Sequence, residues 1–468
     1  MSRPRAPRPF AEARRRIVRR ALHGDVREAA AWVIDRTLAA RAPAGTFLES
    51  AKESCDERDQ GLLHELVRGT LAWLRRLDYV VASASHRSFD RIEPGLHAPL
   101  RLGVYQLLFL DRVPAHAVVD EAVEQAHRAT HRGGASFVNA VLRQVARTPR
   151  LEAWPVQIAD PVERLAIETS HPTFLVRRWL DRFGPESTRA ILEANNRPRP
   201  LHLLAFRDRG GREAAGEELI DEQVEVVASA LAPLGLLVRA GRPRDTRAFS
   251  RGDFYVQDEA SQAAALVPPP GPGERVLDLA AAPGGKSFSI LAWEPTARCV
   301  ACDRSLSRLL LLRDNARRLG RRLPALVMDG GKSACAPVFD RVVADLPCSG
   351  TGTLRRHPEL KWRLRPSEIG RLAGDGLRML LGGAESLRPG GLIAAITCSI
   401  EQEENEDVFA RLLELRPELR PYPLEDRVPL PWGRPVHGAR WQLLPADEHD
   451  GFTVHVAERV DGPRRLRT

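Results

Sequence analysis

Val276-Leu-Asp-Leu-Ala-Ala-Ala-Pro-Gly-Gly-Lys-Ser287 is the stretch from which the architecture of the chain can be predicted. Its first part, residues 275–279, is an apolar run typical of a buried strand, and Asp278 inside that run needs a partner because an unpaired buried charge is costly. Gly284 and Gly285 lack a Cβ atom, so they allow a sharp turn and the close approach of a ligand. The helix that follows directs backbone N–H groups into the same space. The stretch therefore predicts a nucleotide-type pocket at the carboxyl end of a parallel strand.

The spacing of these glycines excludes two common nucleotide-binding motifs. It matches neither the dinucleotide fingerprint G-x-G-x-x-G nor the phosphate-binding loop G-x-x-x-x-G-K-[ST]. Residues 278–286 instead resemble the S-adenosylmethionine (SAM) loop of RNA cytosine-C5 methyltransferases. Because a glycine turn after a strand is common, a purely structural turn is the alternative at this point. Pro283 and Lys286 favour the cofactor loop.

The composition indicates a globular protein of about three domains. The chain has 468 residues, of which 43% are hydrophobic, which is enough for packed cores. No apolar run of about 18 residues is present, so we expect no membrane partner. The formal net charge of +9 favours a polyanion such as nucleic acid as a partner. Charge alone does not distinguish a nucleic-acid-binding surface from a basic surface that is merely solvated.

The cysteines point to a reducing compartment. Six cysteines in a chain of this length are no disulfide scaffold, and no secretory segment opens the chain, so we expect a cytoplasmic protein. We also expect it to be a monomer. Cys299 and Cys302 match the C-x-x-C pattern. In a strand, however, their side chains would point to opposite faces, and the second pair of zinc ligands is missing. We therefore expect no metal.

The N-terminal part of the chain is predicted to be helical. Residues 1–20 form an Arg- and Pro-rich arm, which is interpreted as a disordered tail, an RNA contact or, less well, a transit peptide. Residues 21–148 carry apolar residues at helical spacing, which predicts a small helical bundle. The segments Gly103-Val-Tyr-Gln-Leu-Leu, Pro114-Ala-His-Ala-Val-Val-Asp-Glu-Ala-Val and Phe137-Val-Asn-Ala-Val-Leu-Arg resemble the NusB-type RNA-binding domain.

The remainder of the chain mixes strands and helices. Residues 149–257 are interpreted as a linker and an RRM-like α/β subdomain, with strands at 201–206, 235–239 and 252–257 and a helix over 213–231. Residues 258–462 alternate strand and helix, which predicts a doubly wound parallel sheet. Its strands are expected at 275–279, 298–302, 325–328, 341–344 and 392–397, and its helices at 286–292, 306–319, 367–387 and 403–415. The alternation predicts the α/β fold class. The resemblance to RNA cytosine-C5 methyltransferases further implies a class I (Rossmann-like) SAM-dependent methyltransferase domain.

Acidic residues stand where three of these strands end, namely Asp303, Asp329 and Asp345. Ligands bind at this edge of an open α/β sheet. Asp303 suits a ribose diol, and Asp329, followed by two glycines, suits the adenine edge. One such acid would more often be a helix cap, but three in register with the glycine loop favour a cofactor site. The resemblance implies SAM as the cofactor, and the matching contact positions are Ala280, Ala281, Ala282, Pro283, Gly284, Gly285, Lys286, Asp303, Asp329 and Asp345.

Two cysteines lie on loops beyond neighbouring strands, Cys348 after Pro347 and Cys398 in Thr397-Cys-Ser. Two small buried side chains are the structural alternative. A chemical reason for cysteine exists, because C5 of cytosine becomes nucleophilic only when a thiolate adds to C6. Asp345 is placed to hold the N3/N4 edge of the base during this addition.

This cysteine pair resembles the signature of RNA cytosine-C5 methyltransferases. The resemblance implies that Cys398 is the nucleophile and that Cys348 assists release of the product. DNA cytosine-C5 methyltransferases use the Pro-Cys cysteine as nucleophile, so the presence of both favours the RNA class. The general base for the C5 proton is not identified by the sequence.

A basic loop follows the first cysteine. Arg355, Arg356, His357 and Lys361, with Trp362, are predicted to clamp the RNA backbone and a flipped base. A solvated loop is the alternative.

The resemblance extends over almost the whole chain. The order of a NusB-like bundle, a linking subdomain and a methyltransferase domain is similar to that of bacterial 16S rRNA cytosine-C5 methyltransferases of the RsmB (Fmu/Sun) type, which implies 16S rRNA as the partner and cytosine 967 as the target. Ala280 and Leu346 depart from the residues common in that family, Cys and Ala. Methylation of another rRNA site or of tRNA, a DNA methyltransferase and a non-catalytic RNA-binding assembly factor are the alternatives.

Overall fold

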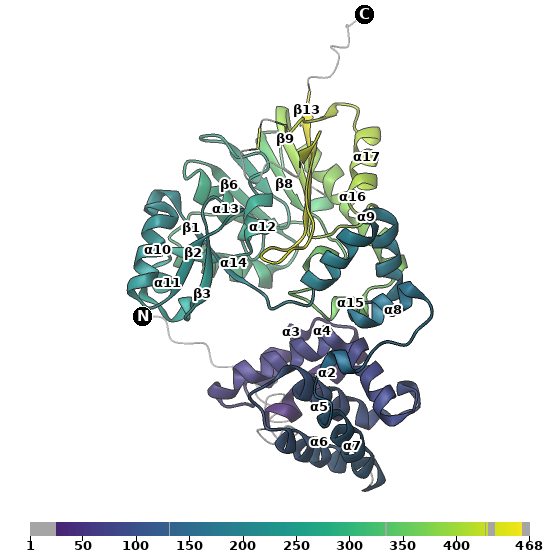
Figure 1. Ribbon diagram of the computed structural model, residues 1–468. Coiled ribbons are helices and arrows are strands. Elements are labelled where there is room, and N and C mark those ends of the chain that lie inside the picture. The colour runs from purple at the N-terminus through teal and green to yellow at the C-terminus, as the bar shows by residue number, and fades with distance from the viewer. Residues whose placement is uncertain (1–24, 131, 333–334, 426, 429–435, 461–468) are drawn as a thin grey trace, which may run out of the picture. The chain divides into compact units, whose positions relative to one another are not determined.

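The structure, a computed structural model, describes residues 25–130, 132–332, 335–425, 427–428 and 436–460. The chain divides into two compact units (Figure 1). The helical unit contains the chain up to Arg197 together with the later segment Leu354–Arg363, and the sheet unit contains the rest. The predicted arm at residues 1–20 lies outside the described residues. No helix within the described ranges is both long and apolar enough to cross a membrane.

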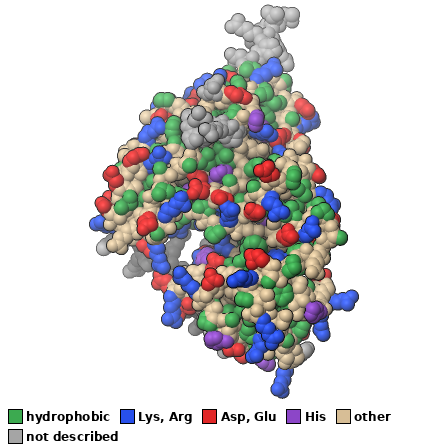
Figure 2. All heavy atoms as spheres, in the orientation of Figure 1, with side chains coloured by type: hydrophobic (Ala, Val, Ile, Leu, Met, Phe, Trp, Pro, Cys, Tyr) green, Lys and Arg blue, Asp and Glu red, His purple; other side chains and the backbone are tan. Residues whose placement is uncertain are grey.

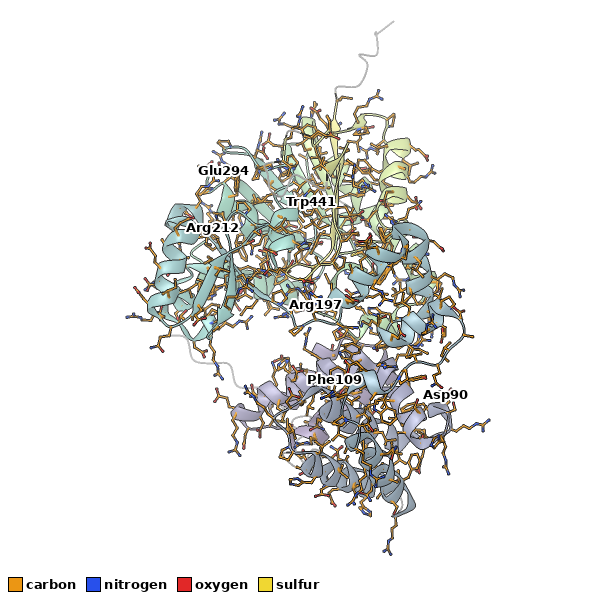
Figure 3. All side chains as sticks on the ribbon, viewed as in Figure 1. Asp90, Phe109, Arg197, Arg212, Glu294 and Trp441 are labelled. Atoms are coloured by element: carbon orange, nitrogen blue, oxygen red, sulfur yellow. The ribbon has the colours of Figure 1, made fainter. Side chains whose placement is uncertain are left out.

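The helical unit is a bundle, as the apolar spacing predicted. In α4 (Gln60–Ser85), Leu63, Leu66 and Leu71 lie on one face and are fully buried in the core of the unit. Phe109, labelled in Figure 3, belongs to this bundle. Its ring stacks on that of Tyr105 with the centroids 5.1 Å apart. The other helices are α2 Val26–Ala40, α3 Ala44–Lys52, α5 His97–Phe109, α6 Ala115–Ala129, α7 Arg132–Ala146, α8 Pro161–Glu168, α9 Thr173–Ala194 and α15 Leu360–Arg363.

The sheet unit begins with a small antiparallel sheet in the strand order β2-β3-β1-β4. Its elements follow the βαββαβ order of a ferredoxin-like fold. They are β1 Leu201–Ala205, α10 Gly211–Asp221, β2 Glu225–Ala228, β3 Gly235–Ala240, α11 Arg247–Arg251 and β4 Phe254–Val256. The expected helix over 213–231 is wrong in its second half. It ends because Gln223 takes a left-handed conformation (φ 63°), after which a β-branched run pairs with β3.

The large sheet has the strand order β11-β12-β13-β9-β8-β5-β6-β7, with β10 on β13. Strands β5 to β9 are parallel, and the order reverses beside β5, which makes a topological switch point between β5 and β8. Trp441 of β12 is fully buried in its core (Figure 3). The elements are α12 Glu259–Ala264, β5 Arg275–Asp278, α13 Gly285–Trp293, β6 Arg298–Asp303, α14 Leu306–Arg318, β7 Ala325–Val327, β8 Phe339–Asp345, α16 Pro366–Glu385, β9 Leu387–Thr397, α17 Glu406–Leu415, β10 Leu419–Pro421, β11 Val436–His437, β12 Arg440–Leu443 and β13 Phe452–Arg459.

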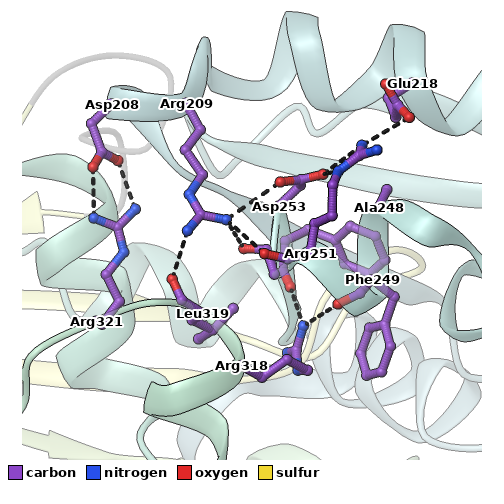
Figure 4. A network of polar contacts seen from close by, with 12 residues as sticks. Asp208, Arg209, Glu218, Ala248, Phe249, Arg251, Asp253, Arg318, Leu319 and Arg321 are labelled. Carbon is purple, nitrogen blue, oxygen red and sulfur yellow. Dashed lines mark hydrogen bonds and ion pairs between the residues drawn. The ribbon is translucent and has the colours of Figure 1, made fainter.

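An arginine network joins the small sheet to the end of α14 (Figure 4). Arg321 makes a two-pronged ion pair with Asp208, with both N–O distances at 2.7 Å. Arg209 donates to the carbonyl of Leu319 at 2.9 Å, and Arg318 donates to the carbonyl of Phe249 at 2.8 Å. Because fork-shaped guanidinium contacts fix orientation as well as distance, the network holds the small subdomain against the helix that follows the second parallel strand.

Candidate active site

The glycine loop between β5 and α13 is built around a buried acid. Asp278 is 0% exposed, and its Oδ2 accepts a hydrogen bond from the Ser287 hydroxyl at 2.7 Å. Burial raises the pKa of Asp278 to about 6, against the lowering effects of Ser287 and Lys286. Gly284 has a φ of 116°, and a Cβ atom there would lie 2.3 Å from the ring of Phe288. Glycine is therefore required at this position for conformation and for space.

Lys286 connects this loop to the end of β8. Its Nζ lies 2.6 Å from Oδ2 of Asp345. Burial alone would lower the pKa of Lys286, but the charges of Asp345 and Asp278 outweigh it and raise that pKa. The lysine therefore stays cationic while buried. The Asp345 side chain is 37% exposed, so this carboxylate also faces solvent, where a ligand could reach it.

The other two predicted acids lie at the expected edge of the sheet. Asp303 ends β6, is buried, and accepts from the N–H of Ser305 at 2.9 Å. Arg308 lies 3.3 Å from Asp303 and also donates to the carbonyl of Ala282, so it ties the acid to the glycine loop. Asp329 follows β7, is exposed, and accepts from the N–H of Gly331 at 3.0 Å. Arg308 was not singled out from the sequence, because arginine is so frequent in this chain.

The two predicted cysteines are neighbours. The Sγ atoms of Cys348 and Cys398 lie 3.5 Å apart. Strands β8 and β9 bring them together, since Asp345 pairs with Ile396 in a parallel register and the N–H of Gly352 donates to the carbonyl of Cys398 at 2.9 Å. The hydrogen bond to Cys398, followed by burial, raises the pKa of Cys348 well above its usual value. At this distance either sulfur can donate to the other.

A hydroxyl and carboxylate network surrounds the cysteine loops, and sequence reasoning missed it. Ser349, Thr351 and Ser399 connect the loops through hydroxyl pairs 3.2 to 3.3 Å apart. Glu404 accepts from Ser349, and Asn405 binds residues on both sides of Cys398. Glu404 and Asn405 follow Thr397-Cys-Ser closely in the sequence. This proximity is the one sequence feature that could have indicated their place beside the cysteine loops.

Comparison with known proteins places the chain in a family. It is 34% identical over 415 residues to the probable ribosomal RNA small subunit methyltransferase B of Bacillus subtilis (strain 168), covering 86% of this chain and 92% of the relative. It is also 34% identical to ribosomal RNA small subunit methyltransferase B of Pseudomonas putida, over 91% of this chain and 96% of the relative. The chain belongs to the RsmB family.

Family models and a solved structure agree with this assignment. Residues 265–456 match the model of the 16S rRNA methyltransferase RsmB/F, residues 24–147 match the NusB family, and residues 171–244 match the ferredoxin-like domain of RsmF/B-like methyltransferases. The crystal structure of PH0851 is similar with a TM-score of 0.75 and 25% identity, over 93% of this chain and 99% of that one. The predicted fold class, a methyltransferase domain with a NusB-like and a small α/β domain, is confirmed.

The basic loop after Cys348 differs from its prediction. In this RsmB-family chain, Leu354–Arg363 belongs to the helical unit. Lys361 is 1% exposed, and its Nζ donates to the Ala72 carbonyl at 3.1 Å, the Ser170 carbonyl at 3.2 Å and the Asn196 side chain at 2.6 Å. Burial lowers the pKa of Lys361 well below its usual value. A side-chain nitrogen that is buried and bonded in this way is not available to a phosphate, so the structure does not support an RNA contact by Lys361.

The neighbours of Lys361 divide into two groups. Arg355 is buried, and Trp362 donates from Nε1 to the Leu71 carbonyl at 2.6 Å, so both help to pack this segment into the bundle. Arg356 is half-buried and His357 is exposed. Of the four residues predicted to contact RNA, these two are accessible to solvent. Figure 2 shows Lys and Arg side chains interspersed with Asp and Glu over the face in view, without a single basic stripe there. Within the described part of the chain, no cluster of three or more His, Cys, Asp or Glu residues could hold a metal ion.

Proposed function

We propose that this RsmB-family chain methylates C5 of a cytosine in 16S rRNA, with SAM as the methyl donor and cytosine 967 as the expected target. The observation that carries the proposal is the 3.5 Å separation of the Cys348 and Cys398 sulfur atoms at the carboxyl ends of adjacent parallel strands. An rRNA substrate implies that the enzyme works in the cytoplasm, where that RNA is processed.

The residues of the glycine loop fit SAM. The sharp turn at Gly284 and the N–H groups at the start of α13 suit a ligand that binds close to the backbone. Asp303 offers a carboxylate for ribose hydroxyls, and Asp329 offers one for the adenine edge. SAM supplies an electrophilic methyl group. The residues proposed to hold it are Ala280, Ala281, Ala282, Pro283, Gly284, Gly285, Lys286, Asp303, Asp329 and Asp345.

The cysteines divide the work on the base. The Cys398 thiolate adds to C6, so that an S–C6 bond forms and the C5–C6 electron pair becomes available at C5. Asp345, kept in place by Lys286, binds the N3/N4 edge and favours protonation at N3 as the adduct forms. After methylation the C5 proton leaves, its electron pair restores the C5–C6 double bond, and the C6–S bond breaks to return the Cys398 thiolate.

The raised pKa of Cys348 supports this assignment. A thiol that keeps its proton is a poor nucleophile, because the thiolate is the reactive form. The reverse assignment, with Cys348 attacking as in DNA cytosine methyltransferases, is the alternative that variants of the two cysteines distinguish. As a protonated neighbour, Cys348 is suited to assist release from Cys398.

Bisulfite mapping of 16S rRNA tests reaction and site together. RNA from a strain that lacks this gene should lose protection of one cytosine, expected at position 967, and re-expression should restore it. Loss at a different rRNA or tRNA cytosine would keep the reaction and change the target. Unchanged protection everywhere, with SAM binding intact, would favour the non-catalytic assembly factor.

A further inference from the structure

Glu404 lies buried just before α17 and binds the loop that carries Cys348. Its Oε1 accepts from the backbone N–H of Ser349 at 2.7 Å, and its Oε2 accepts from the hydroxyl of the same residue at 2.6 Å. The residue is 2% exposed. A carboxylate taken out of water needs such partners. Each oxygen of Glu404 therefore accepts a hydrogen bond from the residue directly after Cys348.

Asn405, the next residue, binds the loop that carries Cys398. Its Oδ1 accepts from the Thr397 hydroxyl at 2.5 Å, and its Nδ2 donates to the Ser399 carbonyl at 3.1 Å. Residues on both sides of Cys398 thus depend on Asn405. Because consecutive Cα atoms are about 3.8 Å apart, one peptide link between Glu404 and Asn405 fixes the two cysteine loops relative to each other.

We propose that Glu404 is a positioning residue that holds the Cys348 thiol beside Cys398, so that the covalent adduct on Cys398 can be resolved. The inference rests on the proposed function, since it concerns the two cysteines of that reaction. Cys398 keeps its own supports, β9 and Asn405, when Glu404 is changed. Loss of Glu404 therefore slows release more than it slows adduct formation.

The charge of Glu404 acts in the same direction. Burial raises the pKa of Glu404 to about 7, with the nearby charge of Glu401 adding to the rise and the bonds from Ser349 and Ser399 opposing it. In its ionised form Glu404 raises the pKa of Cys348, after the larger effects of the Cys398 hydrogen bond and burial. Glu404 thus helps to keep the proton on the thiol that assists release.

Steady-state methylation and adduct formation test this role in the full-length protein. The substrates are tritiated SAM and 16S rRNA lacking the modification. Glu404→Ala should lower kcat by about tenfold or more with little change in KM for RNA. The reason is that a misplaced Cys348 thiol slows the reaction but does not weaken the binding of RNA. It should also accumulate a covalent enzyme–RNA species on denaturing gels. Glu404→Gln, which can still bond to the N–H and hydroxyl of Ser349, should recover most of the turnover.

Glu403→Gln is the matched control, because it removes the same charge one residue earlier from a half-buried side chain. It should behave as wild type. Normal turnover by Glu404→Ala without adduct, or equal losses in the Ala and Gln variants without adduct, would overturn the role. If Glu404→Ala does not fold, Ser349→Ala decides: an adduct supports the role, and wild-type turnover contradicts it. A wild-type protein that methylates no RNA would instead overturn the proposed function.

Discussion

The ammonium of Lys286 lies 2.6 Å from the carboxylate of Asp345 and joins the loop after β5 to the end of β8. These are the two strands on either side of the switch point in the sheet. The pair therefore links the proposed cofactor loop to the acid proposed to hold cytosine. A change in the position of one should alter the position of the other.

Lys286→Met should uncouple these two loops. Asp345 is partly exposed and can be hydrated, so the fold should persist, while methyl transfer should fall on the order of a hundredfold because Asp345 is no longer held in place. Filter-binding assays with tritiated SAM donor measure the rate, and thermal unfolding checks the fold. Lys332→Met, at an exposed lysine, is the control and should leave the rate unchanged.

Cys398→Ala should abolish methyl transfer and leave SAM binding intact, because the variant lacks the proposed nucleophile but keeps the glycine loop. Tritiated-methyl transfer and isothermal titration with SAM measure the two properties. Cys55→Ala, in the helical unit, controls for loss of a cysteine. Full transfer by Cys398→Ala would contradict the assignment.

Cys348→Ala should form the adduct and fail to release it. A slowly migrating enzyme–RNA band on denaturing gels is the expected result, and methyl transfer should stop after about one turnover. The double variant Cys348→Ala/Cys398→Ala should give no such band. A band in the double variant would show that another residue attacks the base.

Asp278→Asn should stabilise the protein without ligand at alkaline pH. Since burial raises the pKa of Asp278 from 3.8 to about 6, the folded state binds a proton more tightly than the unfolded chain, and stability is lost as the pH rises from about 3.8 to about 6. The variant should unfold at a higher urea concentration at pH 8, by an energy on the order of 1 kcal/mol, and the difference should vanish only below about pH 3.8, the unfolded pKa. Asp314→Asn, at an exposed position of α14, is the control. Equal stability of wild type and Asp278→Asn at pH 8 would contradict the cost assigned to burial.

Lys361→Met and Arg356→Gln should separate packing from RNA binding. The methionine leaves three acceptors around Lys361 without a donor, so the helical unit should lose about 1–3 kcal/mol, while the salt dependence of RNA binding stays the same. Arg356→Gln should show the opposite pattern, with a weaker salt dependence and unchanged stability. Salt titrations of RNA binding and urea unfolding provide the two measurements. A reduced salt dependence in Lys361→Met would restore its predicted RNA contact.

The sequence predicted those parts of the site that follow from strand ends. Asp303, Asp329 and Asp345 could be placed because each ends a short apolar run, and parallel strands deliver their carboxyl ends to one edge. Cys348 and Cys398 came together for the same reason. Their sulfur–sulfur distance, by contrast, depends on hydroxyl and carboxylate contacts that no local pattern encodes.

Other features required the tertiary structure. Lysine is usually a surface residue, so the sequence favoured an exposed Lys361. Its three hydrogen-bond acceptors come from Ala72, Ser170 and Asn196, which are far away in the sequence. Strand β2 was mistaken for helix because residues before it are good helix formers, and only the turn at Gln223 separates the two. For Lys361 and for β2, contacts with residues distant in the sequence determined the structure, and the local sequence was compatible with more than one structure.

The inclusion of Leu354–Arg363 in the helical unit also affects how the protein is made. A growing chain that has just finished α9 still lacks Lys361 and Trp362, so the hydrogen bonds that these two residues make in the bundle form only after the first strands of the large sheet have been synthesised. The N-terminal domain is thus finished late, by a segment that the ribosome adds directly after the first of the two cysteines. A chain cut at residue 197 would lose a piece of its bundle, and the order of translation couples completion of the helical unit to that of the sheet unit.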